Sequence, residues 1–100
     1  MMLNYSFTER ALRDVAGARA WYEKQEPELG NRFVDDVLAA IRVARERPMS
    51  CPIVRNGCHG ILCKRFPYRI YFDLRGDHIE IAAVYHTARD PDAWDEPDRQ

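Results

Sequence analysis

The last third of the chain contains two alternating strand patterns on either side of a glycine turn. Every second residue is apolar over 68–74, and again over 79–85 after the turn at 75–77. Because successive side chains of a strand point to opposite faces of a sheet, this spacing predicts two neighbouring strands that bury one common face. The residues assigned to that face are Tyr68, Ile70, Phe72, Leu74, Ile79, Ile81, Ala83 and Tyr85. An amphipathic strand pair needs an apolar layer packed against it, so the rest of the chain must supply one.

Two helices are predicted to provide that layer. Thr8 has the character of an N-cap, with Glu9 in the first turn, and the apolar spacing that follows predicts a helix ending near Glu26. A second helix follows from apolar residues at three- to four-residue spacing over 33–44, and Pro48 ends it. The short connection makes the two helices antiparallel neighbours.

The remaining strands complete the sheet. Alternation over 2–7 predicts a short first strand, and 53–55 a further one before Asn56-Gly57, a strong type I′ turn signal. Another strand is predicted over 61–66, stopped by Pro67. The predicted fold is a two-layer α+β domain, β-α-α-β-β-β, with a helical hairpin on a mostly antiparallel sheet. One domain is expected over 1–95, with a polar tail at 96–100. The expected core is Phe33, Val37, Ile41, Ile70, Phe72, Ile79 and Ile81.

The first residues and the cysteines indicate the compartment in which the chain acts. The first residues show neither a secretory pattern nor a long apolar run, so a cytoplasmic protein is expected. Cys51, Cys58 and Cys63 are then expected to remain thiols. They lack the CxxC spacing of a zinc site, and no metal is predicted. His59 and His78 are expected to be exposed.

Charge is unevenly distributed along the sequence. Residues 42–75 carry eight basic side chains against two acidic ones, whereas residues 76–100 carry two basic against seven acidic. A basic middle segment suits a phosphate backbone or an acidic partner, and it is equally compatible with a solvated surface.

Three pieces of sequence carry a resemblance to a known family. They are Phe66-Pro67-Tyr68-Arg69-Ile70-Tyr71-Phe72, Val84-Tyr85-His86-Thr87-Ala88-Arg89-Asp90-Pro91 and Trp94. With the element order, they resemble the RelE/ParE toxins of bacterial type II toxin–antitoxin systems. The Arg-Asp-Pro ending is more similar to the ParE, or plasmid-stabilisation, branch. The resemblance implies a RelE/ParE-like fold, a cognate antitoxin as partner, inhibition of DNA gyrase without catalysis by the toxin, and no cofactor.

Two alternatives remain open at this point. One is a RelE-type endonuclease that cuts mRNA on the ribosome, with Arg69, His86 and Arg89 as its catalytic residues. The other is a module that has lost toxicity and keeps only antitoxin binding. Acidic residues at 90, 92, 95, 96 and 98 favour the gyrase inhibitor, because an RNA-cleaving toxin needs cations in that stretch.

The candidate functional surface consists of Arg65, Arg69, Tyr71, His86 and Arg89. Arg65 and Arg69 are expected to bind the antitoxin. Alternation along the strands places His86 on the same face as Arg69. Each residue also has a structural interpretation: Arg69 could pair with Asp73, Glu80 or acids of the tail, and His86 could simply end the strand. Asp90 could cap a short helical turn over 91–94, with Trp94 packing back.

Overall fold

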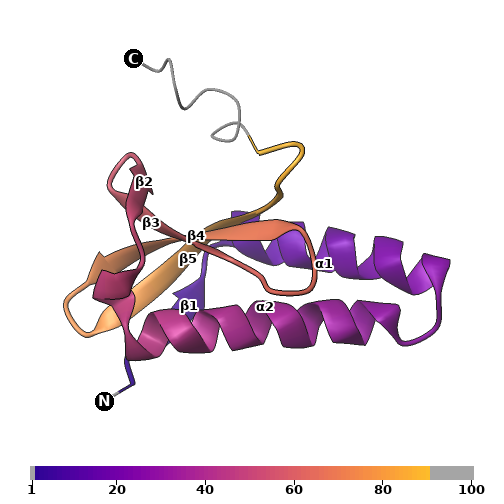
Figure 1. Cartoon of the computed structure of the whole chain (residues 1–100), viewed down its shortest axis with the longest axis horizontal. Coiled ribbons are helices and arrows are strands. Elements are labelled where there is room, and N and C mark those ends of the chain that lie inside the picture. The colour runs from indigo at the N-terminus through magenta and orange to yellow at the C-terminus, as the bar shows by residue number, and fades with distance from the viewer. Residues whose placement is uncertain (1, 91–100) are drawn as a thin grey trace.

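The computed structural model describes residues 2–90, in which a hairpin of two helices packs on one face of a five-stranded sheet (Figure 1). The sheet order is β1-β5-β4-β3-β2, with β1 parallel to β5 and the other neighbours antiparallel. This confirms the predicted α+β class and element order. The elements are β1 (Asn4–Phe7), α1 (Glu9–Gln25), α2 (Leu29–Glu46), a 3₁₀ turn (Pro48–Ser50), β2 (Ile53–Arg55), β3 (Cys58–Leu62), β4 (Tyr68–Arg75) and β5 (His78–His86).

Helix α1 begins where the sequence predicts. Thr8 has extended backbone angles, and its hydroxyl oxygen accepts a hydrogen bond from the Ala11 amide at 3.1 Å. This side chain satisfies one of the amides that a helix leaves unpaired at its start. The same hydroxyl donates to the Ala82 carbonyl oxygen at 3.1 Å, which ties the start of α1 to strand β5.

The connection between the helices is held by one carboxylate. Glu23 accepts hydrogen bonds from the backbone amides of Glu28, at 2.9 Å, and Gly30, at 3.0 Å. These two bonds, the Glu28 bond first, lower the pKa of Glu23 below its usual value. A Cβ at Gly30 would lie 2.7 Å from the Arg19 carbonyl oxygen, so this close approach of the helices requires glycine.

The core lies between the helical hairpin and the sheet. All seven predicted core residues are buried, each with 1% or less of its surface exposed, so that prediction is confirmed. An aromatic cluster closes one end, where Phe33 and Tyr68 lie 4.8 Å apart and Tyr22 and Phe66 lie 4.9 Å apart between ring centroids. Edge contacts of this kind add to the stability gained from burial.

The β2–β3 hairpin confirms the predicted turn and corrects one strand. Asn56 and Gly57 both have positive φ, 48° and 80°, as a type I′ turn requires. A two-residue turn starts the return strand immediately, so β3 occupies Cys58–Leu62 rather than the predicted 61–66. Residues 63–67 instead form the connection to β4.

A bulge in β5 changes which residues face the core. Tyr71 pairs with Ala83 but Phe72 pairs with Ile81, so Ala82 is an extra residue with no partner in the register. Beyond it the alternation reverses, and Val84 becomes the core residue, 3% exposed. The prediction that Ala83 and Tyr85 continue the apolar row of Ile79 and Ile81 is therefore wrong.

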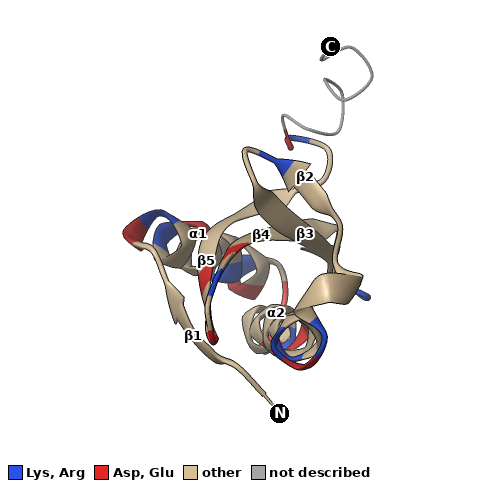
Figure 2. Ribbon diagram, turned by 90° about the vertical axis from the view of Figure 1, so that its left-hand side faces the viewer, with Lys and Arg blue, Asp and Glu red and all other residues tan. Residues whose placement is uncertain are grey.

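Charges of both signs are distributed along both helices (Figure 2). Over the described residues, neither helix combines the length and the apolar content that crossing a bilayer requires.

Candidate functional site

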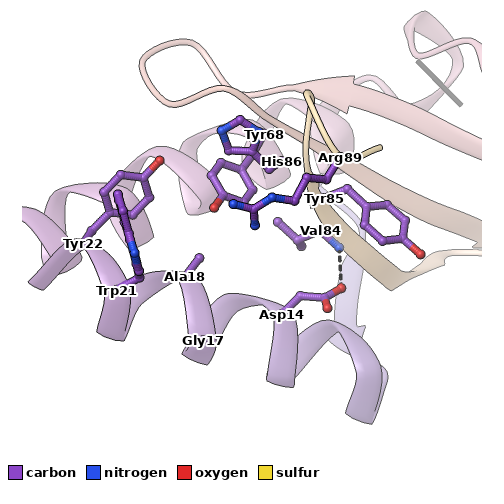
Figure 3. Close-up of a pocket in the computed structure, with 10 residues that line it drawn as sticks. All are labelled: Asp14, Gly17, Ala18, Trp21, Tyr22, Tyr68, Val84, Tyr85, His86 and Arg89. Carbon is purple, nitrogen blue, oxygen red and sulfur yellow. Dashed lines mark hydrogen bonds between the residues drawn. The ribbon is translucent and has the colours of Figure 1, made fainter. Parts of the chain in front are cut away.

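A groove of about 530 Å³ lies between helix α1 and the end of strand β5, called here the α1–β5 groove (Figure 3). On the α1 side the groove is lined by the small residues Gly17 and Ala18. The space beside Gly17 is open, because a Cβ added there would have no other atom within 4 Å. Trp21 forms one wall, with 57% of its surface exposed. The groove is lined by Asp14, Gly17, Ala18, Trp21, Tyr22, Tyr68, Val84, Tyr85, His86 and Arg89.

His86 lies on the helix side of the sheet, in this groove. It pairs across the strands with Tyr68, and the two ring centroids are 5.2 Å apart in an edge arrangement. Arg69 pairs instead with Tyr85, so the prediction that His86 and Arg69 share a face is wrong. The physical reason is the bulge at Ala82, which shifts the alternation by one residue. His86 Nδ1 accepts from the Ala88 amide at 3.0 Å, which leaves Nε2 to carry the proton of the neutral ring.

Arg89 extends across the groove toward α1, beside Tyr68 and above Val84 (Figure 3). Burial raises the pKa of Tyr68 to about 12, Tyr22 adds to the rise, and the positive charge of Arg89 opposes it. At neutral pH the groove therefore presents a protonated phenol, a histidine and a guanidinium on an otherwise apolar and aromatic lining.

The opposite side of the sheet, called here the helix-free face, carries Arg69 and Tyr71. Both are engaged by Asp90, which is 0% exposed. Tyr71 Oη lies 2.7 Å from each carboxylate oxygen of Asp90, and Arg69 Nε lies 3.3 Å from Oδ2. The structural interpretation offered for Arg69 was a pair with Asp73, Glu80 or acids of the tail, whereas the acid that it contacts here is Asp90. The Asp90 carboxylate neutralises this guanidinium in the structure.

A second aromatic residue of this face is Tyr85. Its ring lies 5.8 Å from that of Tyr71, and the Arg10 guanidinium stacks over it at 4.9 Å and also contacts its hydroxyl. A hollow of about 330 Å³ lies alongside, lined by Arg10, Arg55, Asn56, Cys58, Tyr71, Ala82, Ala83 and Tyr85.

Arg65 occupies a third place, in the connection between β3 and β4. The carboxylate of Asp36, on α2, accepts hydrogen bonds from the backbone amides of Arg65 and Phe66 at 2.9 and 2.8 Å. These bonds fix the connection against the helix and leave the side chains of Lys64 and Arg65 exposed. The five predicted surface residues are thus divided: His86 and Arg89 in the groove, Arg69 and Tyr71 on the helix-free face, and Arg65 in the connection.

Sequence reasoning missed Asp14, Asp36 and Trp21. Asp36 falls among Phe33, Val37 and Ala40 on the apolar side of α2 and is 8% exposed. A carboxylate on the apolar side of a helix needs hydrogen-bond donors. The position of Asp36 in the sequence therefore indicated that it would bind donors inside the protein. Trp21 belongs to the apolar spacing that predicts the first helix, and that spacing gives no sign that 57% of its surface is exposed.

The cysteines and the other histidines contribute no metal site. Cys51, Cys58 and Cys63 are free thiols, and burial raises the pKa of Cys63 to about 12. Across residues 2–90 there is no group of three or more His, Cys, Asp or Glu side chains that could hold a metal ion.

His59 is buried, with 7% of its surface exposed. Its ring stacks on Phe72 at 5.1 Å between centroids, and its Nδ1 lies 2.7 Å from the Cys51 carbonyl oxygen. The expectation that His59 is exposed is therefore wrong. The predicted turn over 91–94, Trp94 and the tail at 96–100 lie outside the described residues.

Comparison with known proteins places this geometry in a family. No curated relative matches the chain. Among solved structures, the chromosomal ParDE toxin–antitoxin system of P. aeruginosa is similar, with a TM-score of 0.73 and 19% identity over 85% of this chain and 96% of that one. The RelBE2 toxin–antitoxin complex of Mycobacterium tuberculosis is also similar, with a TM-score of 0.58 and 20% identity over 86% of this chain and 99% of that one. These similarities show the fold. The family described as "ParE toxin of type II toxin-antitoxin system, parDE" matches residues 5–91. The chain therefore belongs to the ParE toxin family of type II toxin–antitoxin systems.

Proposed function

We propose that this chain is a toxin that inhibits DNA gyrase without catalysing a reaction itself, and that a cognate antitoxin holds it inactive. The match to the ParE family over residues 5–91 supports a toxin of a type II toxin–antitoxin system, and the choice of gyrase inhibition is argued from the site. Such a toxin acts in the cytoplasm, where gyrase and DNA are found.

The observation that carries the proposal is the separation of Arg69 from His86. RNA cleavage needs an acid–base group and a charge-stabilising group at one phosphate, within hydrogen-bond reach of the reacting atoms. Here the strand register places His86 beside Tyr68 on the helix side, while Arg69 lies on the helix-free face and is paired with Asp90. The two side chains thus point to opposite faces of the sheet, and this arrangement favours a toxin that works by binding.

RNA cleavage remains the second candidate, because His86 and Arg89 do lie together in the α1–β5 groove. A nuclease built there would have to work without Arg69. Tyr68 would be its nearest further hydroxyl, with a pKa of about 12 that keeps it protonated at neutral pH.

The antitoxin is proposed to be an acidic, amphipathic segment that folds onto the toxin. Both structural neighbours are toxin–antitoxin systems or complexes. The α1–β5 groove offers an exposed Trp21 and the cation of Arg89, which suit an apolar side chain flanked by a carboxylate. The exposed Arg65, in the basic segment 42–75, offers a second contact.

Two assays on the purified toxin separate the candidates. A gyrase inhibitor blocks supercoiling of relaxed plasmid and leaves mRNA on translating ribosomes intact. A nuclease cuts that mRNA, and His86→Ala or Arg89→Ala slows cutting on the order of 10²-fold. If neither activity appears while antitoxin binding persists, the chain is a binding module without toxicity.

A further inference from the structure

The carboxylate of Asp90 is held by two side chains that belong to one strand. Arg69 and Tyr71 are two residues apart on β4, so they point to the same face of the sheet. Asp90 comes from beyond the end of β5 and inserts its carboxylate between them, fully buried. A buried carboxylate is stable only with donors around it, and this one lies 2.7 Å from the phenolic oxygen and 3.3 Å from Arg69 Nε.

The two donors are positioned by the sheet as well as by Asp90. Tyr71 is 4% exposed, pairs with Ala83 and packs against the Tyr85 ring. The stem of Arg69 runs over Gly60, where an added Cβ would lie 3.6 Å from its Cδ. Contacts to β3 and β5 therefore hold both groups, and we expect the pair to remain in place when the carboxylate is removed.

Arg69 also borders a second hollow, from which an external carboxylate can approach it. Its Nε is buried and, although it is ion-paired with Asp90, it makes no hydrogen bond within the described part of the chain. Its side chain is 26% exposed and lines this hollow of about 280 Å³, with Ser50, Cys51, Pro52, Gly60, Ile61 and Leu62. A guanidinium has five N–H donors, so one side can face Asp90 while another faces this hollow.

We propose that Arg69 and Tyr71 form a carboxylate-binding site, which the chain closes with its own Asp90 and which an external carboxylate can occupy in its place. The present occupant is a carboxylate, and carboxylate is therefore the ligand class assigned to the site. While Asp90 is bound, the charge of Arg69 is withheld from other anions. That the external carboxylate is an acidic side chain of the antitoxin rests on the proposed function, whereas the site itself does not.

Chemical rescue tests the site. Asp90→Ala should lower the Tm, and sodium formate should raise it again in a saturable way, relative to sodium chloride at equal ionic strength. At ten times the Kd of formate, the rise should be about 5 °C or more for a domain of this size. If the variant is unfolded in chloride, recovery of its native circular dichroism spectrum on adding formate is the same test. Coincident curves in formate and chloride would overturn the proposal in either case.

Three controls locate the effect. Asp77→Ala removes an exposed acid elsewhere and should gain nothing from formate beyond what the unaltered protein gains. Asp90→Ala combined with Arg69→Gln or with Tyr71→Phe should lose most of the rescue, because each removes one donor. Rescue that persists in both double variants would place the formate elsewhere and contradict the assignment. A larger rise in phosphate than in formate would contradict the choice of carboxylate.

Discussion

The carboxylate of Asp14, on α1, accepts a hydrogen bond from the backbone amide of Val84, on β5, at 2.9 Å (Figure 3). Strand β1 pairs with β5 only as far as Phe7 and Ile81, so within residues 2–90 no strand pairs with that side of β5 beyond the bulge. Asp14 satisfies the amide that β1 leaves unpaired. Together with the contacts of Arg10 to Tyr85, this hydrogen bond holds the last part of β5 against α1, beside the α1–β5 groove.

Removing this acceptor should destabilise the fold. Asp14→Ala leaves the amide of a residue that is 3% exposed without its partner, which should cost about 1–3 kcal/mol of unfolding free energy. Asp14→Asn is the matched control, because its amide oxygen can still accept while the charge is gone. Denaturant unfolding and hydrogen exchange at Val84 measure the effect. Equal losses for both variants would attribute it to the charge instead.

The core residues were predictable because they recur at the regular intervals of single helices and strands. Seven apolar residues follow strict helical or strand periods, and the structure buries all of them. The turn at Asn56-Gly57 was equally predictable, since few residue pairs accept two positive φ angles. The bulge at Ala82 was not readable, because an extra residue between Ile81 and Val84 leaves an apolar run that fits either alternation.

Truncating the core should be costly. Phe72→Ala and Ile81→Ala should each lower the unfolding free energy by about 2–5 kcal/mol, since both residues are fully buried. Leu12→Ala, at a position on α1 that is 53% exposed, should change it by less than about 0.5 kcal/mol. Thermal or denaturant melts compare the three. An unmoved midpoint for either core variant would mean that the face assignment is inverted.

Stability should depend on pH through Glu23. The amides of Glu28 and Gly30 lower its pKa below the usual 4.5. A group whose pKa is depressed in the folded state stabilises the protein above its unfolded pKa, and that contribution is lost as pH falls through the folded value. The unaltered protein should therefore exceed Glu23→Gln in stability at pH 7, and the difference should shrink below pH 4.5. A difference that does not change between pH 7 and pH 3 would contradict this role.

Antitoxin binding should depend on the aromatic wall of the groove. Trp21→Ala should weaken the Kd at least tenfold, because an exposed tryptophan beside a groove is typical of residues that dominate interface energies. Leu12→Ala is the control, on the same helix but outside the groove lining. Calorimetry with the cognate antitoxin, or with its toxin-binding segment, measures both. Equal affinity for the two variants would place the antitoxin elsewhere.

Charge should matter to the same complex. Reversal at Arg65 should weaken antitoxin binding by about tenfold, since attraction to an acidic segment becomes repulsion. Reversal at Arg69 should weaken it as well, because it removes one group of the proposed carboxylate site, and its Tm must be compared because the new acid lies beside the buried Asp90. Arg13→Glu, at an exposed position of α1 outside the basic segment, serves as the control and should have a smaller effect. Unchanged affinity for both the Arg65 and the Arg69 reversals would reject the electrostatic argument.

The functional surface was less predictable than the core, for a physical reason. Residue type identified Arg69, His86 and Arg89 as chemically capable, but their relative positions depend on strand register. One extra residue in β5 moves His86 to the opposite face from Arg69. The Asp90 contact depends on where the chain turns after β5, which no periodic pattern encodes. Family resemblance indicated the class correctly, and the ParE match confirms it.

The supercoiling of relaxed plasmid by purified gyrase is the most direct test of the proposed function. The account predicts that the toxin inhibits supercoiling in a dose-dependent way, that gyrase-linked DNA breaks accumulate, and that prior addition of the antitoxin restores the reaction. Asp90→Asn, which alters the helix-free face, gives a comparison within the same assay. Full supercoiling in the presence of a molar excess of folded toxin would contradict the account, and codon-dependent cleavage of ribosome-bound mRNA by the same preparation would replace it.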